Sequence, residues 1–100
     1  LEIEAAEVPL LTGVERLAQR GLLPGGIESN RNYLGEAVQW GNTRPLIQKI
    51  LLDPQTSGGL LIGLPSNQAS RLLEKLADAQ VFGQYIGAVV NRSTHYLSVQ

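Results

Sequence analysis

The sequence predicts one α+β domain with a mixed, mostly antiparallel sheet and helices packed on one face. Three observations lead to this fold class: an alternating segment at the start, amphipathic helical segments in the middle, and two β-like segments joined by a turn at the end. One hundred residues are near the usual size of a compact domain, and the 43% hydrophobic content can form one modest core. We therefore expect residues 1–100 to form a single domain.

The first two elements follow from local patterns. Residues 1–4 alternate between apolar and acidic side chains, which is the period of a short strand with one buried face. Thr12 and Glu15 have the spacing of a capping box, so a helix is expected at about 12–20. Gly21 then supplies its C-terminal stop.

The next third of the chain is rich in turn-forming residues. Residues 22–32 are expected to form an ordered loop without regular structure because they contain Pro24, Gly25, Gly26, Ser29 and Asn30. Residues 33–40 fit both a helical stripe and a strand, and we leave them open. Pro45 suits the first turn of a short helix that ends near residue 52. Its expected cap is one of two polar residues, Asn42 or Thr43.

A continuous apolar run and a strong helix follow. Leu60–Leu64, stopped by Pro65, is the best candidate for a central strand buried on both faces. Ser66 or Asn67 can cap the next helix. Its apolar stripe repeats at helical spacing and is expected to be core: Ala69, Leu72, Leu73, Leu76 and Ala77.

The last segment is predicted to be a hairpin. Residues 85–90 read as a strand, 91–93 as a turn and 95–99 as the antiparallel partner strand. His95, the only histidine, is expected to face solvent, and Trp40 is expected in core or inter-domain packing.

Composition excludes several classes of function. The net charge is −1, and the eight basic and nine acidic residues do not cluster, which argues against nucleic acid or a membrane surface as partner. The absence of Cys removes disulfides, thiolate chemistry and Cys-type zinc sites, and it fits a cytoplasmic location. No apolar run approaches the roughly 18 residues that span a bilayer. Because the chain opens on Leu1 inside a strand-like pattern, we expect it to be a piece of a longer protein.

The segment Asp53–Gly59 concentrates the polar chemistry between a helix end and an apolar run. It can be a turn in which Asp53 and Pro54 start the bend, the hydroxyls bond the backbone and the glycines allow a left-handed or closely packed path. It can also be a concave anion site for phosphate, built from two hydroxyls and two glycine amides: Thr56, Ser57, Gly58 and Gly59. The residues alone leave both interpretations open.

The ten residues from Asp53 to Ile62, Asp-Pro-Gln-Thr-Ser-Gly-Gly-Leu-Leu-Ile, resemble the signature of the C-terminal domain of selenide, water dikinases (selenophosphate synthetases). That family lies in the superfamily that includes aminoimidazole ribonucleotide synthetase. The resemblance extends over nearly the full chain, through Val8–Leu11, Pro24–Gly26, Arg31–Asn32 and Ile86–Val89. Two features depart from the family pattern: a longer stretch between Gly26 and Arg31, and Ala88 where an acidic residue is common.

The resemblance implies an enzyme that converts ATP, selenide and water to selenophosphate, AMP and phosphate with Mg²⁺. The reactive Cys or selenocysteine, the essential Lys and most metal-binding Asp residues of such enzymes belong to N-terminal regions that this chain lacks. The resemblance thus implies no catalytic residue here, and the N-terminal ATP-binding domain of a homodimeric parent as the main partner. Six residues are implied to line the nucleotide or phosphate cleft: Arg31, Asn32, Thr56, Ser57, Gly58 and Gly59.

Plainer roles and rival functions stay open beside these expectations. Arg31 can form a surface ion pair, Asn32 can fix its loop through backbone bonds, and Asp53, a candidate metal ligand, can cap a turn. The chain can instead be a stand-alone small-molecule-binding or regulatory module, or a structural interaction domain. An RNA-binding role is disfavoured, because only five aromatic residues and no basic patch are present.

Overall fold

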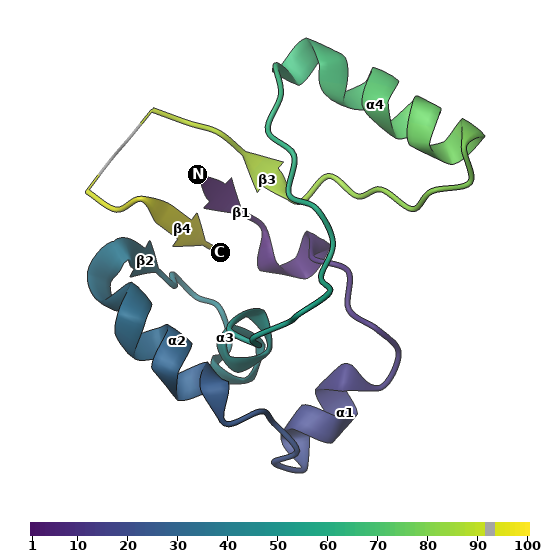
Figure 1. The fold of residues 1–100 in the computed structure, drawn as a ribbon. Coiled ribbons are helices and arrows are strands. Elements are labelled where there is room, and N and C mark those ends of the chain that lie inside the picture. The colour runs from purple at the N-terminus through teal and green to yellow at the C-terminus, as the bar shows by residue number, and fades with distance from the viewer. Residues whose placement is uncertain (92–93) are drawn as a thin grey trace.

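The computed structural model describes residues 1–91 and 94–100 and contains a four-stranded mixed sheet (Figure 1). The strands are β1 (Glu2–Ile3), β2 (Val38–Gln39), β3 (Gly87–Ala88) and β4 (Leu97–Val99), in the spatial order β2-β4-β1-β3. β4 runs parallel to both β1 and β2, and only β3 runs antiparallel to its neighbour β1. The α+β class is therefore confirmed, whereas the expectation of a mostly antiparallel sheet is wrong.

The predicted C-terminal hairpin is also wrong. β1 lies between β3 and β4, with Glu2 opposite Ala88 on one side and opposite Ser98 on the other. The N-terminal strand thus occupies the position that a hairpin partner would take. The predicted turn at 91–93 includes residues 92 and 93, which lie outside the described residues.

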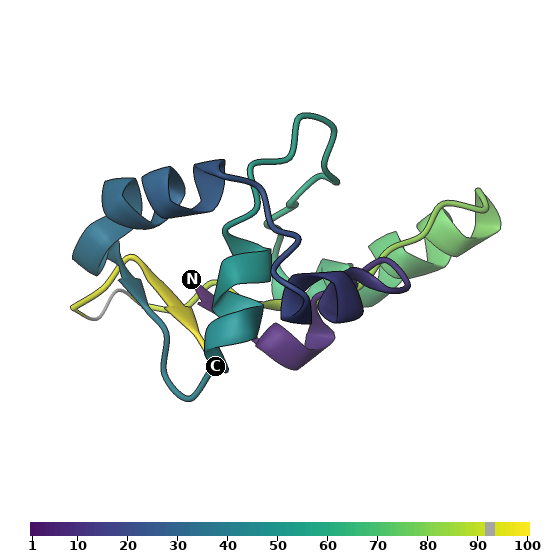
Figure 2. The same ribbon diagram turned by 90° about the horizontal axis from the view of Figure 1, so that it is seen from below.

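The helical segments connect these strands. The α-helices are α1 (Val14–Gln19), α2 (Gly26–Leu34), α3 (Pro45–Leu51) and α4 (Ser66–Asp78), and the 3-10 segments are η1 (Ala5–Glu7) and η2 (Gly35–Ala37). Among the described residues, no helix is long and apolar enough to cross a membrane. Figures 1 and 2 show α4 standing apart from α2 and α3, at the end of two extended connections.

α1 confirms the predicted helix, but its start differs from the expectation. The N-cap is Gly13, with φ of 90° and no side-chain cap, so the capping box from Thr12 is wrong. The stop at Gly21 is confirmed: its φ is 78°, and its N–H donates to the Ala18 carbonyl at 2.9 Å. The next N–H, of Leu22, reaches back to Leu17 at 3.1 Å, which completes a Schellman motif.

α2 replaces the loop that was predicted for residues 22–32. Pro24 and Gly25 only precede the helix, and tertiary contacts favour helical backbone in the residues that follow. Ile27 is buried, and the Asn30 side chain donates to the Leu52 carbonyl at 2.8 Å. The ambiguous stretch 33–40 divides between the end of α2, η2 and β2.

α3 confirms the short helix that begins at Pro45, and it contributes two of the three residues of the core cluster. Neither Asn42 nor Thr43 caps it, because the N-cap is Arg44 without a side-chain bond. The buried Thr43 hydroxyl instead donates to the Val99 carbonyl at 3.1 Å, which ties the start of α3 to β4. The core cluster lies between α1 and α3 and consists of Ala18, Ile47 and Ile50.

The largest departure concerns Leu60–Leu64, which is not a strand. Neither edge of the sheet pairs with it, and Leu60 is 91% exposed, so the prediction of a central buried strand is wrong. α4 begins at the predicted position, but no side chain caps it. None of its residues is fully buried, so the expectation that its apolar stripe is core is wrong as well. A Cβ on Gly83 would lie 2.7 Å from a Leu76 methyl carbon and 3.2 Å from a Leu73 methyl carbon, so these two side chains lie against the chain just after the helix.

Candidate functional site

The segment Asp53–Gly59 forms an exposed loop between the end of α3 and the extended run into α4 (Figure 2). Asp53 is half-buried, and its N–H donates to the Ile50 carbonyl at 3.2 Å. The Gln55 N–H donates to the Asp53 carbonyl at 2.9 Å, and the Gln55 amide approaches the Asp53 carboxylate at 3.4 Å. Asp53 thus begins a turn whose polar contacts are local.

The four residues that follow are exposed and unpaired. Among the described residues, no hydrogen bond involves the hydroxyls of Thr56 and Ser57 or the amides of Gly58 and Gly59. Neither glycine has a left-handed φ, so of the two paths that the turn interpretation allowed, left-handed or closely packed, the left-handed one is not adopted, and the hydroxyls do not bond the backbone. A Cβ on Gly58 would lie 3.1 Å from the flexible end of Gln55, and one on Gly59 would meet open space. Two hydroxyls and two amides are therefore free to bind a ligand.

α2 holds this loop in place. A Cβ on Gly26 would lie 2.7 Å from the Pro54 ring, so only glycine allows this close approach. One turn later, the Asn30 side chain satisfies the Leu52 carbonyl at the end of α3. Sequence reasoning missed Asn30 as a positioning residue. Asn30 lies four residues after Gly26, a spacing that places both on one face of a helix. This signal could be used only if residues 26–34 were predicted to be helical.

Arg31 and Asn32 lie on the same helix but face different surroundings. The Arg31 guanidinium donates to the Gln48 side chain of α3 at 3.4 Å and lies 3.9 Å from the Glu28 carboxylate. Its side chain is 33% exposed, whereas Asn32 is exposed. The structure thus brings α2 against the 53–59 loop through Gly26 and Asn30, while Arg31 contacts α3.

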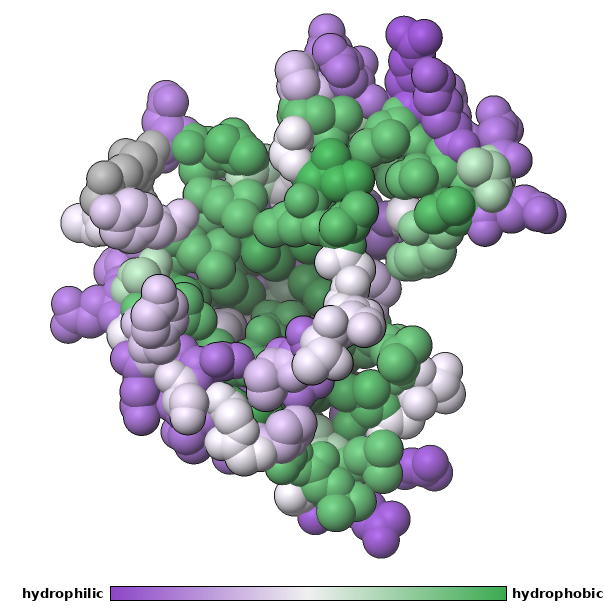
Figure 3. Space-filling model, in the orientation of Figure 1, coloured by the Kyte–Doolittle hydropathy of each residue, from purple (hydrophilic) through white to green (hydrophobic). Residues whose placement is uncertain are grey.

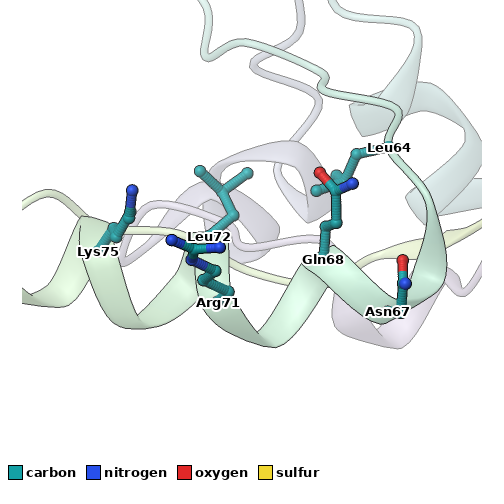
Figure 4. Close-up of a pocket in the computed structure, with 6 residues that line it drawn as sticks. All are labelled: Leu64, Asn67, Gln68, Arg71, Leu72 and Lys75. Atoms are coloured by element: carbon teal, nitrogen blue, oxygen red, sulfur yellow. The ribbon is translucent and has the colours of Figure 1, made fainter.

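Two hollows of the described surface lie away from residues 53–59. A hollow of about 600 Å³ lies along α4, where Figure 4 shows its lining side chains on one side of the helix: Leu64, Asn67, Gln68, Arg71, Leu72 and Lys75. A second, of about 410 Å³, lies beside η1 and the start of α3. The exposed 53–59 loop lines neither of these two hollows.

The described residues offer no metal centre. No group of three His, Cys, Asp or Glu residues could hold an ion there, and Asp53 is a lone carboxylate beside Gln55. The residues present therefore do not fit a bound Mg²⁺ by themselves.

His95 is half-buried, and its Nδ1 lies 2.9 Å from the Glu36 carbonyl oxygen, so it does not simply face solvent.

The fold is of the α+β class, and its exposed 53–59 loop carries two hydroxyls and two glycines. No family model matches the chain. Curated relatives do match: the chain is 37% identical to the selenide, water dikinase of Clostridioides difficile (strain 630) over 101 residues, covering 99% of this chain and 29% of that protein. It is 38% identical to the enzyme of that name from Treponema denticola over 79 residues, covering 79% and 22%.

A third relative, the selenide, water dikinase of Clostridium botulinum (strain Eklund 17B / Type B), is 34% identical over 93 residues, covering 92% of this chain and 27% of that protein. The chain thus spans less than a third of the length of these relatives. It belongs to the selenide, water dikinase family, and the partial coverage is consistent with a C-terminal domain.

Proposed function

We propose that this chain is the C-terminal domain of an enzyme that forms selenophosphate from selenide, ATP and water, with AMP and phosphate as the other products. The observation that carries the proposal is the similarity of nearly the whole chain to part of several proteins named selenide, water dikinase. In this proposal the isolated chain is inactive, and its partner is the N-terminal ATP-binding domain of the same polypeptide. The parent is a cytoplasmic homodimer.

The 53–59 loop walls the cleft between the two domains. Thr56 and Ser57 supply hydroxyl donors, and the amides of Gly58 and Gly59 complete an anion-binding surface for phosphate oxygens. Support comes from the exposure of these residues and from the absence of competing bonds to them in the described part of the chain. Gly26 and Asn30 keep the wall fixed to α2 and α3, which limits the entropy lost when a ligand binds.

Arg31 and Asn32 are proposed to reach the same ligand from α2. The contact between Arg31 and Glu28, at 3.9 Å and partly exposed, is weak, so releasing it for a phosphate costs little. A guanidinium presents two parallel N–H donors, which match the charged oxygens of a phosphate better than the neutral amide oxygen of Gln48. Asn32 is exposed and available as an additional donor.

ATP and Mg²⁺ are proposed to be held mainly by the N-terminal domain. A bound Mg²⁺ would neutralise charge on the triphosphate, with its ligands drawn from carboxylates and phosphate oxygens. The chain itself contributes at most Asp53, which is already bonded to Gln55. This domain therefore orients and screens the phosphates.

A chimera tests the proposal. The chain replaces the 101 aligned residues of the Clostridioides difficile relative, and selenophosphate is followed by phosphorus NMR together with AMP release. We expect the chimera to form selenophosphate and the chain alone to form none. A folded chimera without activity would overturn the proposal.

Gly58→Val in the same chimera tests the role of the loop. Because Gly58 is not left-handed and faces only the flexible end of Gln55, the change leaves thermal stability close to that of the parent. Its branched side chain would block the wall, so we expect kcat/KM to fall about tenfold or more, since small misplacements of bound groups have such effects. Normal values of kcat and KM in this variant would refute the proposal that the loop lines the cleft.

Titration separates this proposal from that of a stand-alone binding module. Isothermal titration of the isolated chain with ATP and Mg²⁺ should give no sub-millimolar binding, because one open wall buries little ligand surface. Sub-millimolar binding by the chain alone would favour the module.

A further inference from the structure

The Arg31 guanidinium is held at one nitrogen and open along one edge. Its Nη1 donates to the Gln48 Oε1 at 3.4 Å, and its Nε lies 3.9 Å from the Glu28 carboxylate. Within the described ranges 1–91 and 94–100, no hydrogen bond or ion pair involves Nη2. A guanidinium carries five N–H donors in one plane, so a bond at Nη1 leaves the edge formed by Nε and Nη2 for a ligand.

The side-chain amide of Gln48 has one fixed orientation. Its Nε2 donates to the Thr43 carbonyl at 2.8 Å. A carbonyl oxygen only accepts, so the amide nitrogen must face Thr43 and the amide oxygen must face the other way. On that side lies Arg31, whose guanidinium only donates. The two neighbours of Gln48 thus impose the same orientation on it.

Thr43, which fixes Gln48, is itself fixed to the sheet. It is buried, its hydroxyl donates to the Val99 carbonyl at 3.1 Å, and its N–H donates to the Trp40 carbonyl at 2.9 Å. A series of hydrogen bonds therefore leads from β4 through Thr43 and Gln48 to Arg31. The guanidinium is connected to the least mobile part of the fold.

Two neighbouring residues of α2 contact consecutive turns of the α3 segment. Asn30 donates to the Leu52 carbonyl at 2.8 Å, and Arg31 donates to Gln48, which lies four residues earlier. Rotation of α2 about its axis would break both bonds, so the direction of the Arg31 side chain is set. Figure 3 shows mainly hydrophilic residues over α2, whereas the hydrophobic residues gather between β3 and α4. The surface around α2 therefore suits a charged, hydrated ligand.

We propose that Gln48 is a positioning residue, which holds Nη1 of Arg31 so that the Nε–Nη2 edge faces a phosphate group of the substrate. This inference rests on the proposed function of Arg31. A free arginine side chain adopts many rotamers, and a ligand that binds it must order them. The bond to Gln48 orders the guanidinium before the substrate arrives. Its open edge presents two parallel N–H groups, which match two phosphate oxygens.

A double-mutant cycle in the chimera with the Clostridioides difficile relative tests this role. Gln48→Met keeps a side chain of similar length and removes both amide bonds, so we expect kcat/KM for ATP to fall about three- to tenfold. Arg31→Ala should lower it about 30-fold or more. The double variant should lie within about twofold of Arg31→Ala, because Gln48 then has no guanidinium to position. Gln19→Met, an exposed residue at the end of α1, is the matched control with normal kinetics.

The possible outcomes separate the inference from the proposed function. If Arg31→Ala loses activity and Gln48→Met does not, the inference is wrong and the phosphate role of Arg31 stands. Losses that multiply in the double variant would also overturn the inference, because Gln48 would then act independently of Arg31. Normal kinetics in Arg31→Ala would refute both the phosphate role and the inference.

Nuclear magnetic resonance of the 100-residue chain tests the positioning without catalysis. The ¹H–¹⁵N heteronuclear NOE of an arginine Nε–H reports its motion on the picosecond to nanosecond timescale. We expect a higher NOE for Arg31 than for Arg71, which is exposed on α4, and a fall to the Arg71 value in Gln48→Met but not in Gln19→Met. Far-UV circular dichroism establishes that each variant is folded. An Arg31 NOE that Gln48→Met leaves unchanged would overturn the proposal.

Discussion

Replacing Thr43 by Val tests the bond that joins α3 to the sheet. Thr43 is 8% exposed, and its hydroxyl donates to the Val99 carbonyl at 3.1 Å. Val has nearly the same shape, so the change removes the donor and leaves a buried carbonyl without it, at a cost of about 1–3 kcal/mol. With a urea m-value of about 1–1.5 kcal/mol/M, the unfolding midpoint should fall by about 0.7–3 M. Urea unfolding followed by far-UV circular dichroism measures this shift.

Thr43→Ser is the control for that substitution. Ser keeps the hydroxyl and loses one methyl group, which lowers the free energy of unfolding by about 1 kcal/mol. The Val variant should therefore be the less stable of the two, although it is the more hydrophobic. If Thr43→Val unfolds at the same urea concentration as Thr43→Ser or higher, the hydrogen bond to Val99 does not stabilise the fold.

Four further substitutions probe the backbone and the surface. Gly21 and Gln80 each follow a helix end and have a positive φ, 78° and 57°. Gly21→Ala should therefore lower the free energy of unfolding by about 1 kcal/mol, and Gln80→Gly should raise it by about 1 kcal/mol. The thermal midpoint should shift in the same direction as the free energy in each case. A calorimetric shift of the same sign for both would contradict this. Gly87→Ala would drive a Cβ into the backbone of β1, so loss of about 2 kcal/mol or more is expected by urea unfolding; an unchanged midpoint would refute the β1–β3 pairing. Arg44→Ala removes an exposed 2.8 Å ion pair with Glu15 and should change stability by less than about 1 kcal/mol; a larger loss in 0.5 M salt would indicate a packing role.

The candidate site was only partly readable from the sequence. The motif from Asp53 to Gly59 located the loop, because hydroxyls and glycines at a helix end are distinctive in any context. The motif could not reveal that Thr56 and Ser57 lack internal partners among the described residues, nor that Asn30 holds the loop from α2. Those facts depend on residues about 20 positions apart.

The two failed strand predictions share one cause. Leu60–Leu64 has the composition of a buried strand, but burial requires other segments to cover it, and this chain leaves it exposed. The final hairpin had suitable local signals, but residues from the other end of the chain, Glu2–Ile3, take the place beside β3. The composition of a segment shows that it can form a strand, whereas pairing and burial by other segments decide whether it does.

The sequence by itself determined the α+β class, the helices near 14–19, 45–51 and 66–78, and the resemblance of the 53–62 segment to the selenide, water dikinases. These features depend on helical periodicity, Gly and Pro positions, and contiguous motifs, all of which act within a few residues. Only the tertiary structure decided that residues 26–34 form a helix, that β1 lies between β3 and β4, and that Leu60, Leu61 and Ile62 are exposed. The physical reason is that strand pairing and burial depend on contacts between residues distant in the sequence, which no local pattern specifies.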